Sequence, residues 1–224
     1  MQSTFHPRAQ RNAFRRRDAR QQSRSDRLLL SSRGLPFALD SRIHLLPMGL
    51  KKIPYRKVGV LLTHYLSTKE DAETATLIRE LRQARVRHYL TRDDLEKVCR
   101  WKSARAIHLI KKNSIARIRT ATRRAIATRS ERRRIEGLTS LNGVSVPMAS
   151  AILTLLYPRR YGVLDIRVWQ LLYAIGAVRK KPGGVGFDFN NWYQFLMIIR
   201  YFAKKLDVGA RDIERSLFLA HRAY

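Results

Sequence analysis

The most constraining feature of this chain is the stretch 135–172, whose pattern reads as two helices joined by a tight turn, followed by a third helix. Ser130 is placed to cap the first helix. Gly143 follows it, because glycine adopts the left-handed conformation without a Cβ clash. Pro147 begins the second helix, where its missing N–H costs no hydrogen bond, and Pro158 ends it. Its apolar residues recur at helical spacing, which predicts one buried face.

The turn between these helices has the sequence L-N-G-V-S-V. Its backbone N–H groups are expected to point outward at the start of a helix. Such groups, together with the positive end of the helix dipole, bind a phosphate oxygen without any charged side chain. The candidate phosphate contacts are Asn142, Gly143, Val144, Ser145 and Val146.

This turn and the following V-L-D-I-R-V-W resemble the helix-hairpin-helix DNA glycosylase superfamily, the group that includes endonuclease III. The resemblance covers roughly residues 90–222, where W-K-S-A-R and R-D-I-E-R-S-L are also similar to uncharacterised bacterial members. It implies an all-α fold of two lobes and a hairpin that grips the DNA backbone, with a possible bridging monovalent cation. Gly143 matches the first hairpin glycine, and Asp165 matches the catalytic aspartate that faces a flipped nucleotide.

The chain departs from the family pattern at two positions. Ser145 replaces the second hairpin glycine, which makes a left-handed backbone there costlier. Pro147 stands 18 residues before Asp165, where strand-cutting members have their lysine nucleophile. Proline cannot form a Schiff base, so the resemblance implies a monofunctional enzyme without lyase activity through this position.

Asp165 has a purely structural interpretation as well, because aspartate is a common helix N-cap. The two interpretations are compatible, since a capping carboxylate is held in one orientation and kept ionised by the helix dipole. Loss of a base builds positive charge on the sugar, which a carboxylate stabilises while orienting the attacking water. The nucleotide must first leave the stack, at a cost of a few kcal/mol.

Other candidate site residues lie in the part of the sequence that the resemblance covers. Trp101 is either a stacking ring for the base, with Lys102 and Arg105 on phosphates, or a core residue beside solvated cations. Arg167 either contacts phosphate and shifts the pKa of Asp165 or is a surface arginine. Tyr157 either flanks the base pocket or is a core or rim aromatic.

The composition favours a polyanionic partner, because Lys and Arg number 46 against 17 Asp and Glu, a formal charge of +29. Double-stranded DNA is the expected partner. A membrane surface is the rival, but no run of about 20 apolar residues is present to span a bilayer. The single cysteine, Cys99, excludes a disulfide framework and a four-cysteine iron–sulfur site, and it suits a cytoplasmic, nucleoid-associated setting. The six histidines lack metal-ligand spacing, so no metal or other cofactor is expected.

The chain divides into a basic arm with a connector, 1–50, and the helix-hairpin-helix domain, 51–224. Residues 1–34 hold nine Arg and two Asp without apolar periodicity, which predicts a disordered arm that adds phosphate contacts. Two alternatives remain: the arm is a transit peptide, or translation begins at Met48. In the domain, 65–157 would form the hairpin-bearing lobe and 160–222 the other.

The remaining helices are predicted from caps and periodicity. Ser67 and Glu70 form a capping box for a helix to about Arg87. Asn190 or Asn191 caps a helix to Leu206, and 182–188, P-G-G-V-G-F-D, is a connector, since no βαβ unit surrounds it. The other predicted helices are 91–101 capped by Thr91, 104–112, 115–129 capped by Ser114 with Ile115, Ile118, Thr122 and Ile126 inward, 165–175, and 210–221.

We therefore expect a monofunctional DNA N-glycosylase that removes a damaged or modified base and uses Asp165. The alternative is a non-catalytic DNA- or RNA-binding protein with the same hairpin. A third hypothesis is an enzyme that removes virus-specific modified bases.

Overall fold

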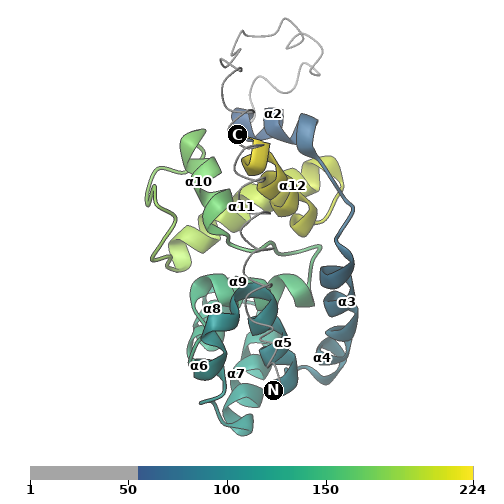
Figure 1. Ribbon diagram of the computed structural model, residues 1–224, viewed down its shortest axis with the longest axis vertical. Coiled ribbons are helices and arrows are strands. Elements are labelled where there is room, and N and C mark those ends of the chain that lie inside the picture. Colours follow the sequence, from purple (N-terminus) through teal and green to yellow (C-terminus); the bar gives the residue numbers. More distant parts are fainter. Residues whose placement is uncertain (1–54, 224) are drawn as a thin grey trace, which may run out of the picture. The chain divides into compact units, whose positions relative to one another are not determined.

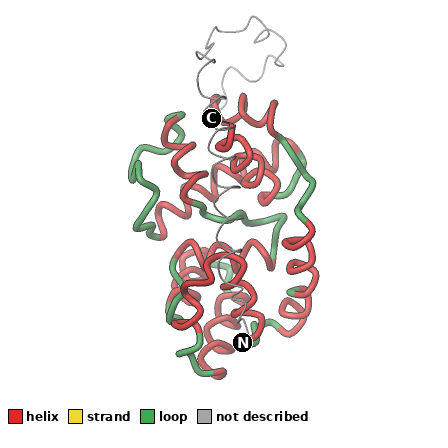
Figure 2. The backbone as a smooth tube through the Cα atoms, viewed as in Figure 1, coloured by secondary structure: helices red, strands yellow, loops and turns green. Residues whose placement is uncertain are grey.

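The computed structural model of the chain describes residues 55–223, and these residues form helices and loops with no strand, as predicted (Figures 1 and 2). None of the described helices is long and apolar enough to cross a membrane. The predicted basic arm and its connector, 1–50, lie outside the described residues. The elements are α2 (Arg56–Tyr65), α3 (Ala72–Glu80), α4 (Arg82–Arg87), α5 (Arg92–Ser103), the 3-10 turn η3 (Ala104–Ala106), α6 (Ile107–Ile110), α7 (Ile115–Ala127), α8 (Glu131–Thr139), α9 (Val146–Leu156), α10 (Ile166–Ala174), α11 (Phe189–Leu206) and α12 (Ala210–Ala223).

Side-chain caps begin most of these helices. The caps predicted at Thr91, Ser114, Ser130 and Asp165 are confirmed, and Thr91 adds a capping box with Asp94. A side-chain oxygen at such a position satisfies an N–H group that has no partner inside the helix.

Two predicted caps are wrong. No helix begins at Ser67: α3 begins at Ala72, after Asp71 accepts from the N–H of Thr74 at 2.8 Å. The carboxylate of Glu70 binds the Arg211 guanidinium of α12 instead, a tertiary contact that local sequence does not reveal.

The second error concerns α11. Asp188 caps it, and Asn191, three residues on, completes a capping box rather than capping the helix itself.

The predicted buried stripe of α7 is also partly wrong. Ile118 and Thr122 are buried, but the side chain of Ile115 is 66% exposed. Ala121 and Ala125 are buried instead, facing Gly137 of α8, where a Cβ would lie 3.7 Å from the Cβ of Ala125. Because α7 and α8 pack closely, only small residues fit where they meet. The spacing of large apolar residues in the sequence does not reveal this contact.

Helix α9 lies at the centre of the described fold, and every residue from Met148 to Leu156 is buried (Figure 1). It packs against α3, α4, α5, α8 and α11. A helix that is apolar on all sides is stable only when neighbours surround it. The hairpin residues at its N-terminus are therefore attached to a helix that is buried on all sides.

A loop, 157–165, leads from α9 to α10 (Figure 2). Tyr161 in this loop is buried and donates its hydroxyl to Glu131 at 2.9 Å. The same carboxylate accepts from the guanidinium groups of Arg200 at 2.8 Å and Arg160 at 3.0 Å, and Arg134 lies 3.4 Å away. Glu131 thus joins α8, the loop and α11, and the loop delivers Asp165 to the start of α10.

Candidate functional site

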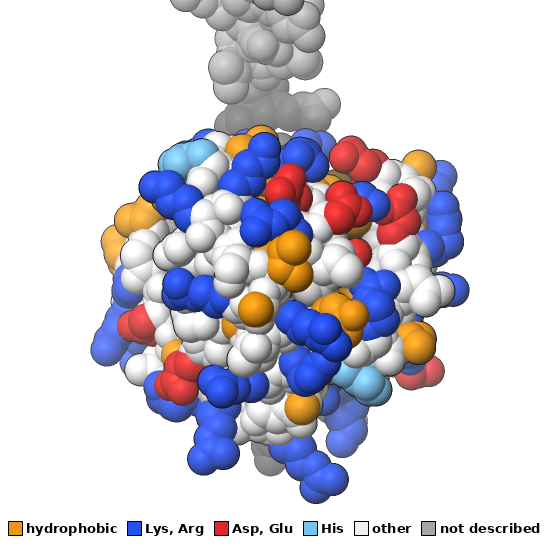
Figure 3. All heavy atoms as spheres, turned by 90° about the horizontal axis from the view of Figure 1, so that it is seen from below, with side chains coloured by type: hydrophobic (Ala, Val, Ile, Leu, Met, Phe, Trp, Pro, Cys, Tyr) orange, Lys and Arg blue, Asp and Glu red, His pale blue; other side chains and the backbone are white. Residues whose placement is uncertain are grey.

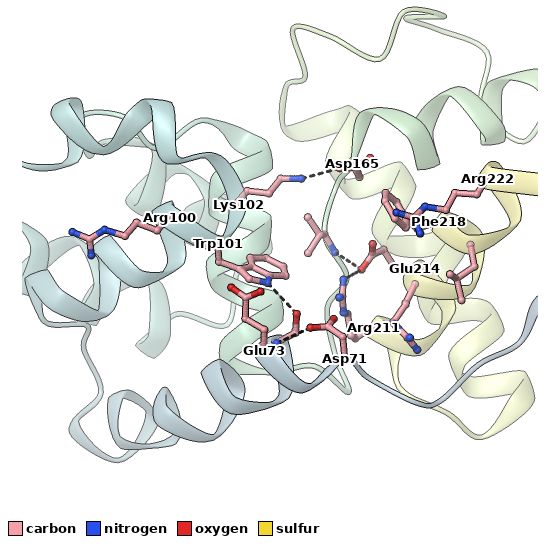
Figure 4. Close-up of a pocket in the computed structure, with 14 residues that line it drawn as sticks. Asp71, Glu73, Arg100, Trp101, Lys102, Asp165, Arg211, Glu214, Phe218 and Arg222 are labelled. Carbon is pink, nitrogen blue, oxygen red and sulfur yellow. Dashed lines mark hydrogen bonds and ion pairs between the residues drawn. The ribbon is translucent and has the colours of Figure 1, made fainter. Parts of the chain in front are cut away.

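Asp165 is the centre of the candidate site. Its Oδ1 accepts a hydrogen bond from the N–H of Arg167 at 2.9 Å, so it is the N-cap of α10. Its Oδ2 lies 2.9 Å from Nζ of Lys102, which comes from α5 (Figure 4). The side chain of Asp165 is 24% exposed and that of Lys102 is 19% exposed, so the ion pair is largely withdrawn from water. The structure thus brings together two candidates that stand 63 positions apart in the sequence.

The surroundings keep Asp165 ionised. Burial alone would raise the pKa of the carboxyl, but the charge and hydrogen bond of Lys102 and the N–H of Arg167 outweigh it. The pKa of Asp165 consequently lies below its ordinary value. The Asp165 carboxylate is therefore ionised at neutral pH and paired with the ammonium of Lys102.

A cavity of about 580 Å³ opens on one side of Asp165, between α5 and α12 (Figure 4). Trp101 and Phe218 contribute aromatic surface to its lining, and the remaining lining is mostly charged. The indole Nε1 of Trp101 donates to the hydroxyl of Thr74 at 3.0 Å, and the Arg211 guanidinium lies 5.7 Å from the ring centroid. Trp101 is therefore half-buried: it packs against the core and also faces the cavity.

The inner wall of this cavity contains a second carboxylate, Glu214 of α12, which is 2% exposed. It accepts from the N–H of Val163 at 3.3 Å and from the guanidinium of Arg211, which also binds Glu70 at 2.8 Å. Burial raises the pKa of Glu214 despite the charge of Arg211. Gly162 permits this approach, because a Cβ there would lie 2.7 Å from Cβ of Glu214. Glu214 thus holds the backbone two residues before Asp165.

A second cavity, of about 450 Å³, opens on the other side of Asp165. Ser145 and Pro147 line it from the hairpin side, and Lys102 and Arg105 line it from α5 and η3. Gly184 to Phe187, from the loop before α11, complete the wall. Asp165 and Lys102 line both cavities, so they form the partition between them.

The hairpin has the backbone that its glycine predicts. Gly143 has φ +79°, and a Cβ there would lie 2.9 Å from Cβ of Leu109. Ser145 is extended, with φ −76°, and caps α9 through a bond from the N–H of Met148. The expected cost of a left-handed serine therefore does not arise. Serine at this position performs a cap function that glycine has no side chain to provide.

Asn113 fixes the hairpin from the neighbouring helix-turn segment. Its buried amide donates to the carbonyl of Asn142 at 3.0 Å and accepts from the N–H of Asn142 at 2.9 Å. The N–H of Val144 binds the carbonyl of Leu141. Two of the five predicted phosphate contacts, Asn142 and Val144, therefore use their N–H groups internally. Within residues 55–223, the N–H groups of Gly143, Ser145 and Val146 have no hydrogen-bond partner.

The remaining predicted residues are placed differently. The Arg167 guanidinium is exposed and lies 5.6 Å from the ring centroid of Phe218, at the first cavity's aromatic wall. Tyr157 lines neither cavity beside Asp165 and packs near Tyr161, with 6.4 Å between ring centroids.

Sequence reasoning missed several residues of this site. Glu214 and Arg211 stand on an amphipathic C-terminal helix whose charges resemble an ordinary solvated face. Asn113 resembles a loop asparagine. The segment 182–188 is the connector that the sequence predicts, but the sequence does not show that it lines the cavity beside Asp165. Only the exclusion of water around Glu214 and Asn113 distinguishes them, and burial of this kind depends on distant segments.

Among residues 55–223, no His, Cys, Asp and Glu side chains are grouped in a way that would hold a metal ion. Comparison of the chain with protein families, curated proteins and solved structures found no match.

Proposed function

We propose that this chain is a monofunctional DNA N-glycosylase that removes a damaged or modified base flipped from duplex DNA. One observation carries the proposal: an ionised aspartate, fixed as a helix cap, separates two cavities, one lined by the hairpin and one by aromatic side chains. This arrangement offers separate places for the strand and for the extruded base.

The hairpin side suits the sugar-phosphate backbone. The N–H groups of Gly143, Ser145 and Val146, which have no partner within residues 55–223, would bind a phosphate at the start of α9, where the helix dipole favours an anion. Arg105 adds a cation on the same wall. An extruded base would enter the other cavity, between Trp101 and Phe218, where stacking on an aromatic face favours any base.

Asp165 would then lie beside the sugar. As the bond to the base breaks, positive charge develops on the sugar, and the fixed carboxylate stabilises it and orients the attacking water. Lys102 keeps the carboxylate ionised before the substrate arrives. Its ammonium has three N–H donors, so it can bind Asp165 and a phosphate or the departing base together.

The helices can be divided in the same way, into one group beside the hairpin and one beside the aromatic cavity. We assign α3–α9 to a hairpin-bearing lobe and α10–α12 with α2 to a second lobe, in the manner of the helix-hairpin-helix glycosylases. The basic residues 1–34 would add sequence-independent phosphate contacts. DNA as substrate implies a cytoplasmic, nucleoid-associated location.

A specific observation favours a second candidate, a nucleic-acid-binding protein without catalysis. Guanidinium groups of Arg87, Arg119 and Arg123 lie 5.7, 4.6 and 5.6 Å from the ring centroid of Tyr89. Tyr89 lines neither cavity at Asp165. Lys and Arg side chains are also spread widely over the face shown in Figure 3. A basic surface outside the cavities would suffice for binding.

The test compares wild type with Asp165→Asn on duplexes carrying assorted lesions and virus-specific modified bases, followed by alkali to cut at any abasic site. We expect cleavage by wild type and a rate at least about 100-fold lower for the variant, since a fixed charge of this kind stabilises the transition state. The control is Asp207→Asn, an exposed aspartate with a left-handed backbone that asparagine tolerates.

The two candidates give different results in this assay. Equal rates for wild type and Asp165→Asn would contradict the assigned role of the carboxylate. No cleavage by wild type across the whole panel, with DNA binding retained, would favour the non-catalytic protein.

A further inference from the structure

A cavity of about 370 Å³ lies between α3, the start of α4, the loop 157–165 and the N-terminal end of α12. We call it the α3–α12 cavity. Asp165 does not line it, and the proposed chemistry does not use it. Its volume falls within the range of about 300–1,000 Å³ that is typical of small-molecule sites.

Three arginines from three separate segments line this cavity: Arg79 of α3, Arg82 of α4 and Arg159 of the loop. All three are exposed. Arg79 donates to the hydroxyl of Thr76 at 2.8 Å, but within residues 55–223 none of the three arginines forms an ion pair with a carboxylate. Like charges repel one another, so a bound anion would offset the cost of gathering these guanidinium groups around one cavity.

Two carboxylates also line the cavity, but both are bonded to donors at the N-terminal half of α12. Glu70 lies 2.8 Å from the guanidinium of Arg211 and 3.4 Å from that of Arg215. Oδ2 of Asp212 accepts from the N–H of Gly209 at 2.8 Å. The lining holds four arginines against these two carboxylates, so it remains positively charged.

The loop that carries Arg159 is fixed to α12 by its backbone. The N–H of Ala210 donates to the carbonyl of Arg159 at 3.1 Å, and the N–H of Arg211 donates to the carbonyl of Pro158 at 3.0 Å. This part of the wall is therefore formed before any ligand binds, which lowers the entropy cost of binding. Because the loop uses these N–H groups of α12, side chains and not the helix terminus would bind an anion here.

The rest of the wall is apolar. Ala75, Ile78 and Pro158 are partly buried and line the cavity beside the arginines. An apolar part of a ligand would be removed from water against these side chains. The cavity thus combines a place for an anion with a place for a carbon skeleton.

We propose that the α3–α12 cavity binds a phosphate monoester of about the size of a mononucleotide. Such a group has three terminal oxygens and a charge of about −1.5 to −2 at neutral pH. Arg79, Arg82 and Arg159 approach from three segments, and each guanidinium presents a planar fork of N–H donors that fits phosphate oxygens. A carboxylate has two oxygens and one charge, so it would satisfy fewer of these donors. The inference does not depend on the proposed chemistry at Asp165.

The test titrates the full chain with adenosine 5′-monophosphate by isothermal calorimetry in about 0.15 M salt, which screens weak non-specific attraction. Adenosine and inorganic phosphate are titrated separately, because the proposed ligand needs both its phosphate and its carbon skeleton. The cavity variants are Arg82→Met and Arg159→Met. Arg124→Met is the matched control, since it removes an exposed arginine of α7 that does not line the cavity. This control is needed because a chain with a formal charge of +29 attracts any phosphate.

We expect saturable binding of one adenosine 5′-monophosphate per chain. Each cavity variant should bind it about tenfold more weakly, the order expected for losing one charge-assisted hydrogen bond. Arg124→Met and Asp165→Asn should bind it as wild type does. Adenosine should not bind, and inorganic phosphate should bind more weakly than the nucleotide. Because only the folded chain binds, the nucleotide should also raise the Tm of wild type and Arg124→Met more than that of the cavity variants.

Three results would overturn the inference. Equal affinities in the cavity variants and Arg124→Met would show attraction to net charge alone. Inorganic phosphate that binds as tightly as the nucleotide would show a simple anion site. The third result separates a free phosphate monoester from a strand: the nucleotide fails to bind, while the cavity variants weaken binding of a duplex without terminal phosphates more than Arg124→Met does. The cavity would then hold backbone phosphate instead.

Discussion

The two sides of Asp165 are held by different kinds of contact. On the hairpin side, the buried amide of Asn113 and the left-handed backbone of Gly143 hold the turn without charge. On the α12 side, the buried Glu214 and the partly buried Arg211 and Glu70 form a network of charges around the loop that leads to Asp165. Asp165 therefore lies between a turn that neutral groups hold and a loop that ion pairs hold.

The proposed function offers a reason for this difference. If the turn binds a phosphate, it needs free N–H groups, which neutral contacts leave available. The α12 side has no such constraint, and Arg211 compensates the buried acid there. Neutral contacts are expected to be insensitive to salt and pH, whereas buried ion pairs are costly to break singly.

The largest effect on stability is expected from disrupting the ion pairs on the α12 side. Arg211→Met leaves the carboxylates of Glu70 and Glu214 without their shared partner, so the free energy of unfolding should fall by about 3–5 kcal/mol. Urea denaturation at neutral pH measures it. Arg222→Met removes an exposed arginine from the same helix and should change stability by less than about 0.5 kcal/mol. Similar losses in the two variants would show that the network contributes nothing beyond net charge.

A smaller effect is expected on the neutral side. Asn113→Ala removes the amide that binds both polar groups of the Asn142 backbone, so stability should fall by about 1–3 kcal/mol. Affinity for duplex DNA should fall with it, because the hairpin loses its fixed shape. Urea denaturation and fluorescence anisotropy measure the two quantities, with the exposed Asn190→Ala as control. Unchanged stability in Asn113→Ala would mean that the hairpin is held by its glycine and the core alone.

The smallest effect on stability at neutral pH is expected from changing the Lys102–Asp165 pair, which lies between the two cavities. Lys102→Met removes the cation that lowers the pKa of Asp165 while burial remains, so this pKa should rise. In wild type, the folded pKa lies below the unfolded value. The stability from ionised Asp165 is thus present above the unfolded pKa and lost as pH falls through the folded one. The variant should therefore lose stability relative to wild type at neutral pH, and the difference should vanish in acid.

Carboxyl ¹³C NMR titration measures this pKa directly and does not depend on base release. The control is Lys97→Met on the same helix, whose ammonium binds Glu80 and Asp93 rather than Asp165. An Asp165 pKa that is equal in wild type and Lys102→Met would show that the ion pair does not govern its ionisation.

Local signals in the sequence were sufficient for most helices. Thr91, Ser114, Ser130 and Asp165 cap helices where predicted, because a cap depends only on the next three residues. One predicted cap failed because a distant group binds the side chain, as when Arg211 binds Glu70, and the other failed locally, because Asp188 precedes the predicted asparagines and caps α11 itself. The prediction that Ile115 is buried was wrong for a related reason, because the neighbouring helix α8 packs against the small residues of α7 instead.

The sequence by itself determined an all-α body, a glycine turn before an apolar helix, and an aspartate at a helix start, because each depends on backbone propensities over a few residues. Only the tertiary structure decided that Lys102 binds Asp165, that Glu214 is buried beside it, and that Val185 stands at the same cavity. These residues come from separate helices and loops. Their proximity depends on how the apolar faces pack, and burial then changes the chemistry of each charged group.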